Sequence, residues 1–348
     1  MNKVRVINIS RWILGGLFSF SGIVKCVDPV GTAVFVEKYL AAFSLDVFLP
    51  IALPIAIVLS VAEFTLGQLL LDGKPHRITA IATLAIMSLF TIVTLLNATV
   101  LPIGDCGCFG DAIRLTPVQT LIKNVVLLPL SALMIVGACR GKFNYLQTAI
   151  GVAISLGVCL YSLRYQPIID FMPFRVGVNL REEIMRERQE LDSQSATYLV
   201  FSNAEGEELL FESDDTECWL RDDLEFVESR SEAPASVLQP FAEFIVTSAQ
   251  GEECTLDFLA ENSDVLLLTV YDVDALSGRR LKAAKELLDG QQRVVVLTSA
   301  EASVITEILG VEPFMLDAMT LRSLIRSRVG VVEINAGVIV RKCDVRDL

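Results

Sequence analysis

The chain has 348 residues, of which 53% are hydrophobic, with a mean hydropathy of +0.54 and a formal net charge of −13. This composition is too apolar for a water-soluble protein of this length, so part of the chain is expected to lie in lipid. Residues 1–164 contain 12 Lys and Arg against 7 Asp and Glu, whereas residues 165–348 contain 17 against 35. The charge predicts a membrane domain followed by an acidic domain in water, and this acidity excludes nucleic-acid binding because phosphates would be repelled.

Five apolar segments are predicted to be membrane helices. They cover residues 12–24, 47–71, 78–101, 118–138 and 146–163. The second, third and fourth are long enough for a hydrocarbon core of roughly 30 Å, which takes about 20 helical residues. The first is extended by residues 4–9 and is followed by no small-residue cleavage site, which predicts a retained signal anchor.

Basic residues predict the orientation of these helices. Seven precede the first span or lie in the loops that share its side: Lys3, Arg5, Arg11, Lys74, Arg77, Arg140 and Lys142. The opposite side has four, which are Lys25, Lys38, Arg114 and Arg164. This asymmetry predicts a cytoplasmic N-terminus and places the loop between the third and fourth spans and the C-terminal domain outside the cytoplasm, where disulfides are stable.

The loop between the third and fourth spans carries the sequence Asp105-Cys106-Gly107-Cys108-Phe109-Gly110-Asp111. A disulfide between Cys106 and Cys108 would close a very small ring, and a strained disulfide is easily reduced. Zinc does not fit, because its first two ligands are normally separated by two to four residues and His76 lies in another loop. The alternative is that these cysteines are small structural hydrophobes.

Cys26 ends the first span on the same predicted side and could resolve a mixed disulfide with Cys106 or Cys108. Lys25 and Lys123 lie at a similar depth, and a neighbouring cation favours the reactive thiolate. The alternative is that both lysines only anchor helix ends at the headgroups. Whether Cys106 pairs with Cys108 or with Cys26 is left open by the sequence.

Glu63 is a carboxyl group inside the second span. Counting from Pro50 places it roughly 20 Å below the outer surface, which predicts that it is too deep to pair with Lys25. It is expected either to be protonated and bonded to Ser88 or Thr91, or to belong to a proton path or cofactor pocket.

A cofactor pocket at the outer face would be formed by Glu63, Lys25, Lys123 and Asn97. No nucleotide, flavin or haem motif is present in the sequence, and a quinone dissolved in the bilayer is the natural electron carrier. No metal site is expected.

The N-terminal part resembles the DoxX/MauE family of redox-associated membrane proteins. The resemblance covers about 140 residues and rests on Ser21 to Lys25 with Asp28-Pro29, on Glu63 with Gly67, on residues 106–111, and on Thr116 to Thr120 with Lys123-Asn124. It implies a role in handling thiols, disulfides or electrons at the outer face of a bacterial inner membrane. The overall layout resembles membrane proteins of Bacteroides-type bacteria.

Residues 165–240 are expected to form a linker and a small β-rich region, with a helix at 182–191, a hairpin of 197–202 with 207–212, and a further strand at 224–229. From residue 241 the pattern predicts strands at 241–247, 265–271, 293–297, 331–335 and 338–342. Helices are predicted at 278–289, 300–309 and 318–328. This order resembles a thioredoxin-like domain.

The resemblance to thioredoxins does not extend to their chemistry. Their paired cysteines follow the strand that corresponds to 265–271, where this chain has Asp272-Val273-Asp274-Ala275. Arg328-Val329-Gly330 stands where their cis-proline is expected. Without a thiolate no exchange can occur there. Among the remaining cysteines, Cys218 is expected to be exposed, and Cys254 and Cys343 buried.

The predicted fold class is therefore an α-helical membrane bundle followed by an α/β thioredoxin-like domain. Its expected domains are residues 1–140 and the fifth membrane helix 141–164, then residues 165–240 and 241–348. The leading hypothesis is thiol–disulfide or electron exchange with extracytoplasmic protein thiols or disulfides, through Cys106, Cys108 and Cys26. The alternative is a non-catalytic membrane scaffold that displays a docking domain, and a transporter with Glu63 as proton carrier is the weaker third candidate because no inverted repeat is evident.

Overall fold

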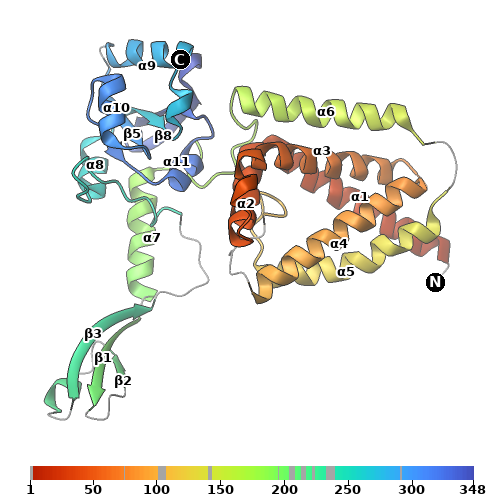
Figure 1. Cartoon of the computed structure of the whole chain (residues 1–348), viewed down its shortest axis with the longest axis horizontal. Coiled ribbons are helices and arrows are strands. Elements are labelled where there is room, and N and C mark those ends of the chain that lie inside the picture. Colours follow the sequence, from red (N-terminus) through yellow and green to blue (C-terminus); the bar gives the residue numbers. More distant parts are fainter. Residues whose placement is uncertain are drawn as a thin grey trace.

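A helical bundle and an α/β domain make up most of the computed structural model, and a three-stranded sheet projects from the latter on a helix (Figure 1). The structure describes residues 3–73, 75–100, 107–139, 143–194, 196–203, 208–212, 217–221, 224–232, 240–290 and 292–348.

Five helices of the bundle are long and apolar enough to cross a membrane. They are α1 (Lys3–Val27), α3 (Ala52–Leu71), α4 (Arg77–Thr99), α5 (Pro117–Gly137) and α6 (Tyr145–Arg164). Helix α1 packs against α3, α5 and α6, and its Leu14 and Phe18 enter a core with Leu70, Met87 and Met134. The five spans predicted from the sequence are confirmed, which makes the chain a multi-pass membrane protein.

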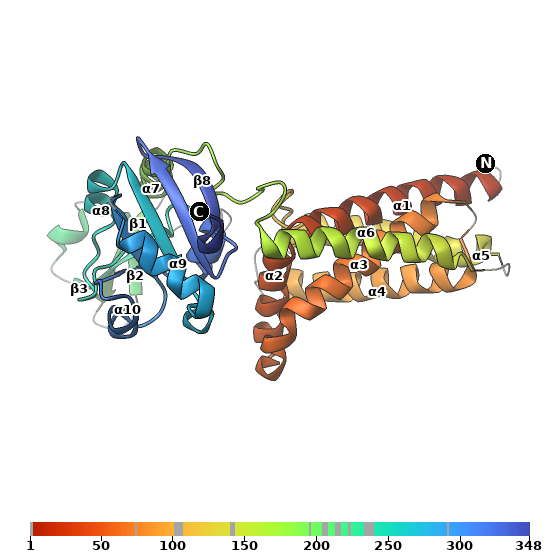
Figure 2. The ribbon, with the colours of Figure 1, turned by 90° about the horizontal axis from the view of Figure 1, so that it is seen from above.

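A sixth helix, α2 (Pro29–Ala42), lies across one end of the bundle (Figure 2) and was not predicted. The carboxylate of Asp28 accepts a hydrogen bond of 2.8 Å from the backbone N–H of Gly31, and Pro29 occupies the first turn. An N-cap Asp followed by Pro is a strong helix start. The helix leads through a 3-10 turn, Asp46–Ile51, into α3.

Helices α1 and α3 approach each other closely at two glycines. A Cβ atom added to Gly22 would lie 2.6 Å from the Cα atom of Phe64, and one added to Gly67 would lie 2.8 Å from the Cα atom of Ser19. Small residues allow such backbone contact between membrane helices. The close crossing sets the relative height of the two helices.

Gly22→Ala is therefore expected to push α1 and α3 apart and to lower the free energy of unfolding by about 1–3 kcal/mol. Thermal unfolding in detergent measures the change. Gly16→Ala in the same helix is the matched control, since nothing lies within 4 Å of its added Cβ atom. Equal stability of the two variants would contradict the close crossing.

The two ends of the bundle differ in what they carry (Figure 1). One end holds the N-terminus and the α3–α4 and α5–α6 junctions, where the Arg11 guanidinium donates to the carbonyls of Leu70 and Leu71. The other end holds α2, the loop that contains Cys108, and the α/β domain. The structure thus places this loop and the α/β domain at the same end of the bundle.

The α/β domain is built on a five-stranded sheet in the order β6-β5-β4-β7-β8. The strands are β4 (Val265–Val270), β5 (Val294–Thr298), β6 (Phe314–Met315), β7 (Val329–Asn335) and β8 (Val338–Asp344). Strands β4, β5 and β6 are parallel, whereas β7 is antiparallel to both β4 and β8. The predicted strands in this region are confirmed except the first, and β6 was missed.

Helices cover both faces of this sheet. On one face α9 (Gly278–Leu288) and α10 (Ala302–Leu309) pack over Leu268 and Val296. On the other lie α7 (Leu180–Gln194), α8 (Thr255–Glu261) and α11 (Ala318–Leu324). Phe174, Leu180 and Ile184 enter this second core, so part of the segment expected to be a linker belongs to the domain.

Residues 241–247, predicted to be a strand, form a turn followed by isolated bridges at Thr247. The prediction is wrong because Phe241, Phe244 and Val246 all enter the same core, which an alternating strand would not allow. Helix α11 is also shorter than predicted and ends at Leu324.

The projecting sheet contains β1 (Ala196–Asn203), β2 (Glu208–Glu212) and β3 (Leu224–Glu232), with β1 antiparallel to both of its neighbours. The predicted hairpin and third strand are confirmed. Cys218, expected to be exposed, is buried with 1% of its surface accessible, so that expectation was wrong. The polar sequence around Cys218 suggested an exposed loop, but the chain there forms a short 3-10 turn, Glu217–Leu220, whose Trp219 packs on Phe201 and Phe226 of the sheet.

Candidate functional site

A buried chain of polar groups runs from α3 through α1 to the cysteine loop. The ammonium of Lys25 lies 2.5 Å from Glu63 Oε1, and the hydroxyl of Ser21 lies 2.6 Å from Glu63 Oε2. The same hydroxyl lies 2.7 Å from the backbone carbonyl of Cys108. Side chains of Lys25 and Glu63 are 4% and 1% exposed, so the ion pair is shielded from solvent.

The pairing of Lys25 with Glu63 corrects the sequence prediction that the two lie at different depths. Counting from Pro50 failed because the last turn of α1 is buried and does not lie at the bundle surface. The close contact of Gly22 with Phe64 aligns the last turn of α1 with the level of Glu63. Glu63 bonds to Ser21 and Lys25, and Thr91, one of its two expected partners, donates to Met87 instead.

Ser21 offers only one hydroxyl hydrogen to the two oxygens that it contacts. Both the Glu63 carboxylate and the carbonyl of Cys108 are acceptors, so the Ser21 hydroxyl can donate to only one of them at a time. Ser21 therefore links the buried ion pair to the cysteine loop through an exchangeable hydrogen bond.

The described part of the loop folds back into the end of the bundle. The ring of Phe109 is 8% exposed and lies 5.6 Å from that of Phe20, with the Lys123 ammonium 4.6 Å from its centroid. Gly107 and Gly110 have φ values of +63° and +53°, which favour glycine. The N–H of Gly110 donates to the carbonyl of Gly107 at 3.1 Å, which fixes a tight turn around Cys108.

An ionic cluster joins this loop to the α/β domain. Arg326 donates to both carboxylate oxygens of Asp28 and, at 2.7 Å, to Asp111. The Arg326 side chain is 5% exposed. Burial raises the pKa of the Asp111 carboxyl above its usual value, although the charge of Arg326 opposes the shift.

A cavity of about 270 Å³ lies between α2, α3 and α4 beside the loop. Its walls are almost entirely apolar and include Phe35, Tyr39, Leu59 and Phe90. Lys25 and Cys108 also line it, so the cavity touches both the ion pair and the cysteine loop. An apolar space with a few polar groups is typical of a site for a hydrophobic small molecule.

Residues 3–137 match the family model of the methylamine utilisation protein MauE. The membrane domain is MauE-like. A further relative is Protein TlpB of Flavobacterium psychrophilum, which is 27% identical over 160 residues. That match covers 44% of this chain and 43% of TlpB, so the chain aligns with less than half of its relative. No solved structure matches the chain.

The MauE-like domain does not bring every predicted site residue to one place. Cys108, Lys25 and Glu63 lie together, and Lys123 reaches the loop through Phe109. Asn97 donates at 3.3 Å to the hydroxyl of Tyr39, which lines the cavity from α2. Cys106 lies outside the described residues.

Cys26 points into the contact between α1 and α6. It is fully buried, and its thiol interacts with that of Cys159 in α6, which is also fully buried. The sequence reasoning did not consider Cys159. The role of Cys26 as a resolving thiol for the loop stays a prediction.

The sequence reasoning also missed Ser21, Asp28, Asp111 and Arg326 as functional candidates. Asp111 lies in the cysteine loop and Asp28-Pro29 is a helix-start signal, so both could have been weighed. Nothing local points to Arg326. Among the residues that the structure describes, no group of three or more His, Cys, Asp or Glu could hold a metal ion.

Proposed function

We propose that this protein carries out thiol–disulfide or electron exchange at Cys106 and Cys108. The observation that supports it best is the buried chain of Lys25, Glu63 and Ser21, which ends on the Cys108 backbone. Charged groups inside a membrane are costly, and where they occur they mark functional pathways. A chain of this kind beside a thiol suits a reaction that moves protons and electrons together.

Oxidation of two thiols to a disulfide forms one S–S bond and releases two electrons and two protons. When an exported protein disulfide is the oxidant, it takes up both and becomes a dithiol. In this proposal Lys25, which lines the cavity, Glu63 and Ser21 form the proton path between the cavity and the loop.

The cavity supports a quinone as the electron carrier in the membrane. A bound quinone would accept two electrons and two protons, which would complete the balance of thiol oxidation. Lys25 and Cys108 line the cavity, so a quinone bound there and the cysteine loop would both lie close to the proton path. The apolar walls would hold the ring and exclude water.

The proposal is tested with protein in lipid nanodiscs, a small dithiol and a short-chain quinone. We expect dithiol-dependent quinone reduction, followed by absorbance. Leu59→Trp should slow it severalfold because the larger ring fills the cavity, whereas Val58→Trp, at a position 68% exposed on the same helix, should not. Absence of exchange with quinones and with protein disulfides alike would refute the proposed function.

The orientation of the chain is a further part of the proposal. The positive-inside rule supports a cytoplasmic N-terminus and a periplasmic cysteine loop and α/β domain in a bacterial inner membrane. A C-terminal fusion to alkaline phosphatase is expected to be active, and a C-terminal green fluorescent protein dark. The opposite pair of results would place the cysteine loop in the cytosol, where disulfides are disfavoured.

We further infer that the α/β domain is thioredoxin-like. The supporting features are parallel β4 and β5, joined through α9, and the antiparallel pair β7 and β8 beside β4. Its 272–275 segment has no thiol, which favours the second candidate function, a scaffold that displays this domain. A scaffold would keep its activity in cells when both loop cysteines are replaced.

A further inference from the structure

The α/β domain meets the MauE-like domain through one edge. This edge is formed by the residues that follow β4 and those between α11 and β7. The hydroxyl of Tyr271 donates to the carbonyl of Arg326 at 2.8 Å, and Arg328 pairs with Asp272 at 3.3 Å. A cleft of about 520 Å³ has these segments on one side and α2 with the start of α3 on the other. The edge therefore faces this chain's own membrane domain.

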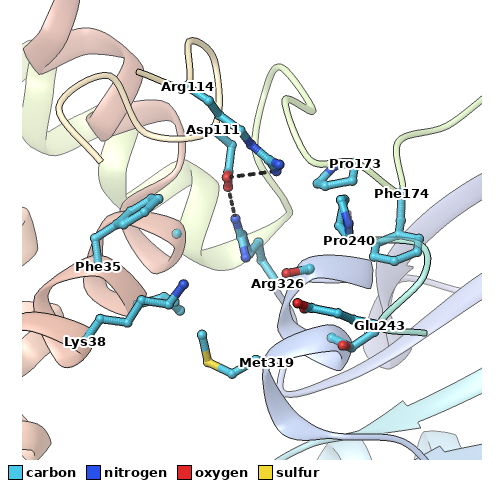
Figure 3. A pocket seen from close by; sticks show the side chains of 14 residues that line it. Phe35, Lys38, Asp111, Arg114, Pro173, Phe174, Pro240, Glu243, Met319 and Arg326 are labelled. Carbon is cyan, nitrogen blue, oxygen red and sulfur yellow. Dashed lines mark hydrogen bonds and ion pairs between the residues drawn. The ribbon is translucent and has the colours of Figure 1, made fainter. Parts of the chain in front are cut away.

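Arg326 is the most deeply buried charged residue of this edge. Its guanidinium reaches Asp28 with donors at 2.7, 3.0 and 3.1 Å and Asp111 at 2.7 Å, while a further donor holds the carbonyl of Arg322. Figure 3 shows the side chain extending from the α/β domain to Asp111, with Arg114 on the far side of the carboxylate. A planar fork with several donors can bridge two carboxylates at once.

The guanidinium of Arg326 passes close to the backbone of α2. A Cβ atom added to Gly31 in α2 would lie 2.6 Å from an Arg326 nitrogen, so a glycine is needed where the guanidinium passes the first turn of α2. Arg322, one turn earlier in α11, forms a second ion pair with Glu37 of α2 at 2.5 Å. Both contacts hold the same edge onto α2.

Asp111 connects the Arg326 contacts to the cysteine loop, because it lies only three residues after Cys108. The turn between them is closed by the Gly110 to Gly107 hydrogen bond, and the N–H of Ala112 donates to the carbonyl of Phe109. A segment this short and bonded moves as one unit. The loop is thus held by Ser21 and Phe109 from inside the membrane domain, and by Arg326 from outside it.

We propose that the α/β domain acts on its own chain, as the holder of the cysteine loop, with Arg326 as the positioning residue. This inference rests on the proposed function only in taking the loop as the redox site. By binding Asp111 and Asp28 together, Arg326 fixes the position of Cys108 relative to the membrane domain. This position sets the reactivity and the redox potential of the Cys108 thiol. The domain can fill this role without a thiol in its 272–275 segment.

The test measures the loop in full-length protein in nanodiscs. After reduction, a pulse of a maleimide labels the thiols, and mass spectrometry of the loop peptide gives the alkylation rate. Equilibration in glutathione buffers gives the midpoint potential. Arg326→Gln is expected to raise the alkylation rate by about tenfold or more, as loss of a buried charge pair would allow, and to shift the midpoint potential.

Companion variants separate positioning from folding. Asp111→Asn leaves Arg326 bound to Asp28 and is expected to reproduce the effect even if Arg326→Gln does not fold. Arg326→Lys retains the charge but not the fork, so it should be intermediate. Arg328→Gln, whose partner Asp272 lies in the same domain, is the control and should match the unmodified protein.

The outcomes are distinct from those for the proposed function. Altered rates and potentials in Arg326→Gln and Asp111→Asn, with unfolding temperatures near that of the control, support the positioning role. Unchanged rates and potentials in either folded variant overturn it. A loop that never changes its redox state in cells would refute the proposed function, yet would leave the alkylation difference measurable.

Discussion

Replacing Cys106 and Cys108 together by serine is expected to reduce disulfide exchange and quinone reduction to the uncatalysed background. Only a thiolate can attack a disulfide, and a serine hydroxyl is not ionised at neutral pH. Each single replacement is expected to be nearly as damaging, because one thiol can form a mixed disulfide but cannot resolve it. The accumulation of such a mixed disulfide in one single variant would identify the attacking cysteine.

Cys254→Ser provides the control for this experiment. Burial, reinforced by the neighbouring acidic residues, raises the pKa of the Cys254 thiol, which leaves it mostly protonated and unreactive at neutral pH. Its replacement should leave the exchange rate unchanged. A double serine variant that retained full exchange would mean that the reaction occurs elsewhere in the chain.

Glu63→Ala is expected to destabilise the protein by about 3–5 kcal/mol, because it leaves the ammonium of Lys25 buried without a partner. The two side chains are almost fully shielded and 2.5 Å apart, so neither solvent nor salt can compensate. Unfolding temperatures in detergent would measure the loss. The exposed pair Lys282 and Glu286, 3.7 Å apart, is the control, and Glu286→Ala should change stability by less than about 1 kcal/mol.

A double replacement separates stability from function at this pair. Lys25→Met with Glu63→Leu removes both charges and fills the space with apolar side chains, which is often neutral or stabilising. We expect this variant to recover most of the lost stability and to remain slow in exchange, because the proton path is gone. Recovery of both stability and exchange would assign the pair a purely structural role.

The membrane part was largely predictable because length and apolar character suffice to find spans. Helix α2 was missed because it lies across the bundle and has no long apolar run, although Asp28-Pro29 marks its start. The pairing of Lys25 with Glu63 was wrongly excluded, because the depth count depended on a helix boundary and ignored the glycine contact between α1 and α3. The depth of Glu63 relative to Lys25 depends on how α1 and α3 pack, which counting residues along one helix cannot determine.

The link through Arg326 could not have been predicted, because 298 residues separate it from Asp28 and no local pattern marks it. The other predicted strands of the α/β domain could be located from their apolar runs. Residues 241–247 were wrongly predicted to be a strand, because their apolar side chains enter the core from a turn. The 3-10 turn that contains Cys218 packs on the small sheet through the contact of Trp219 with Phe201, which the polar sequence around Cys218 does not indicate.

Redox trapping in intact cells shows directly whether the loop cysteines change their redox state. Cells are quenched with acid, free thiols are alkylated, and mass spectrometry determines the oxidised fraction of Cys106 and Cys108 with and without added reductant. We expect a mixture of thiol and disulfide that shifts with conditions, or a mixed disulfide to an exported protein. Loop cysteines that stay fully oxidised or fully reduced under every condition would contradict the proposed function and favour the scaffold.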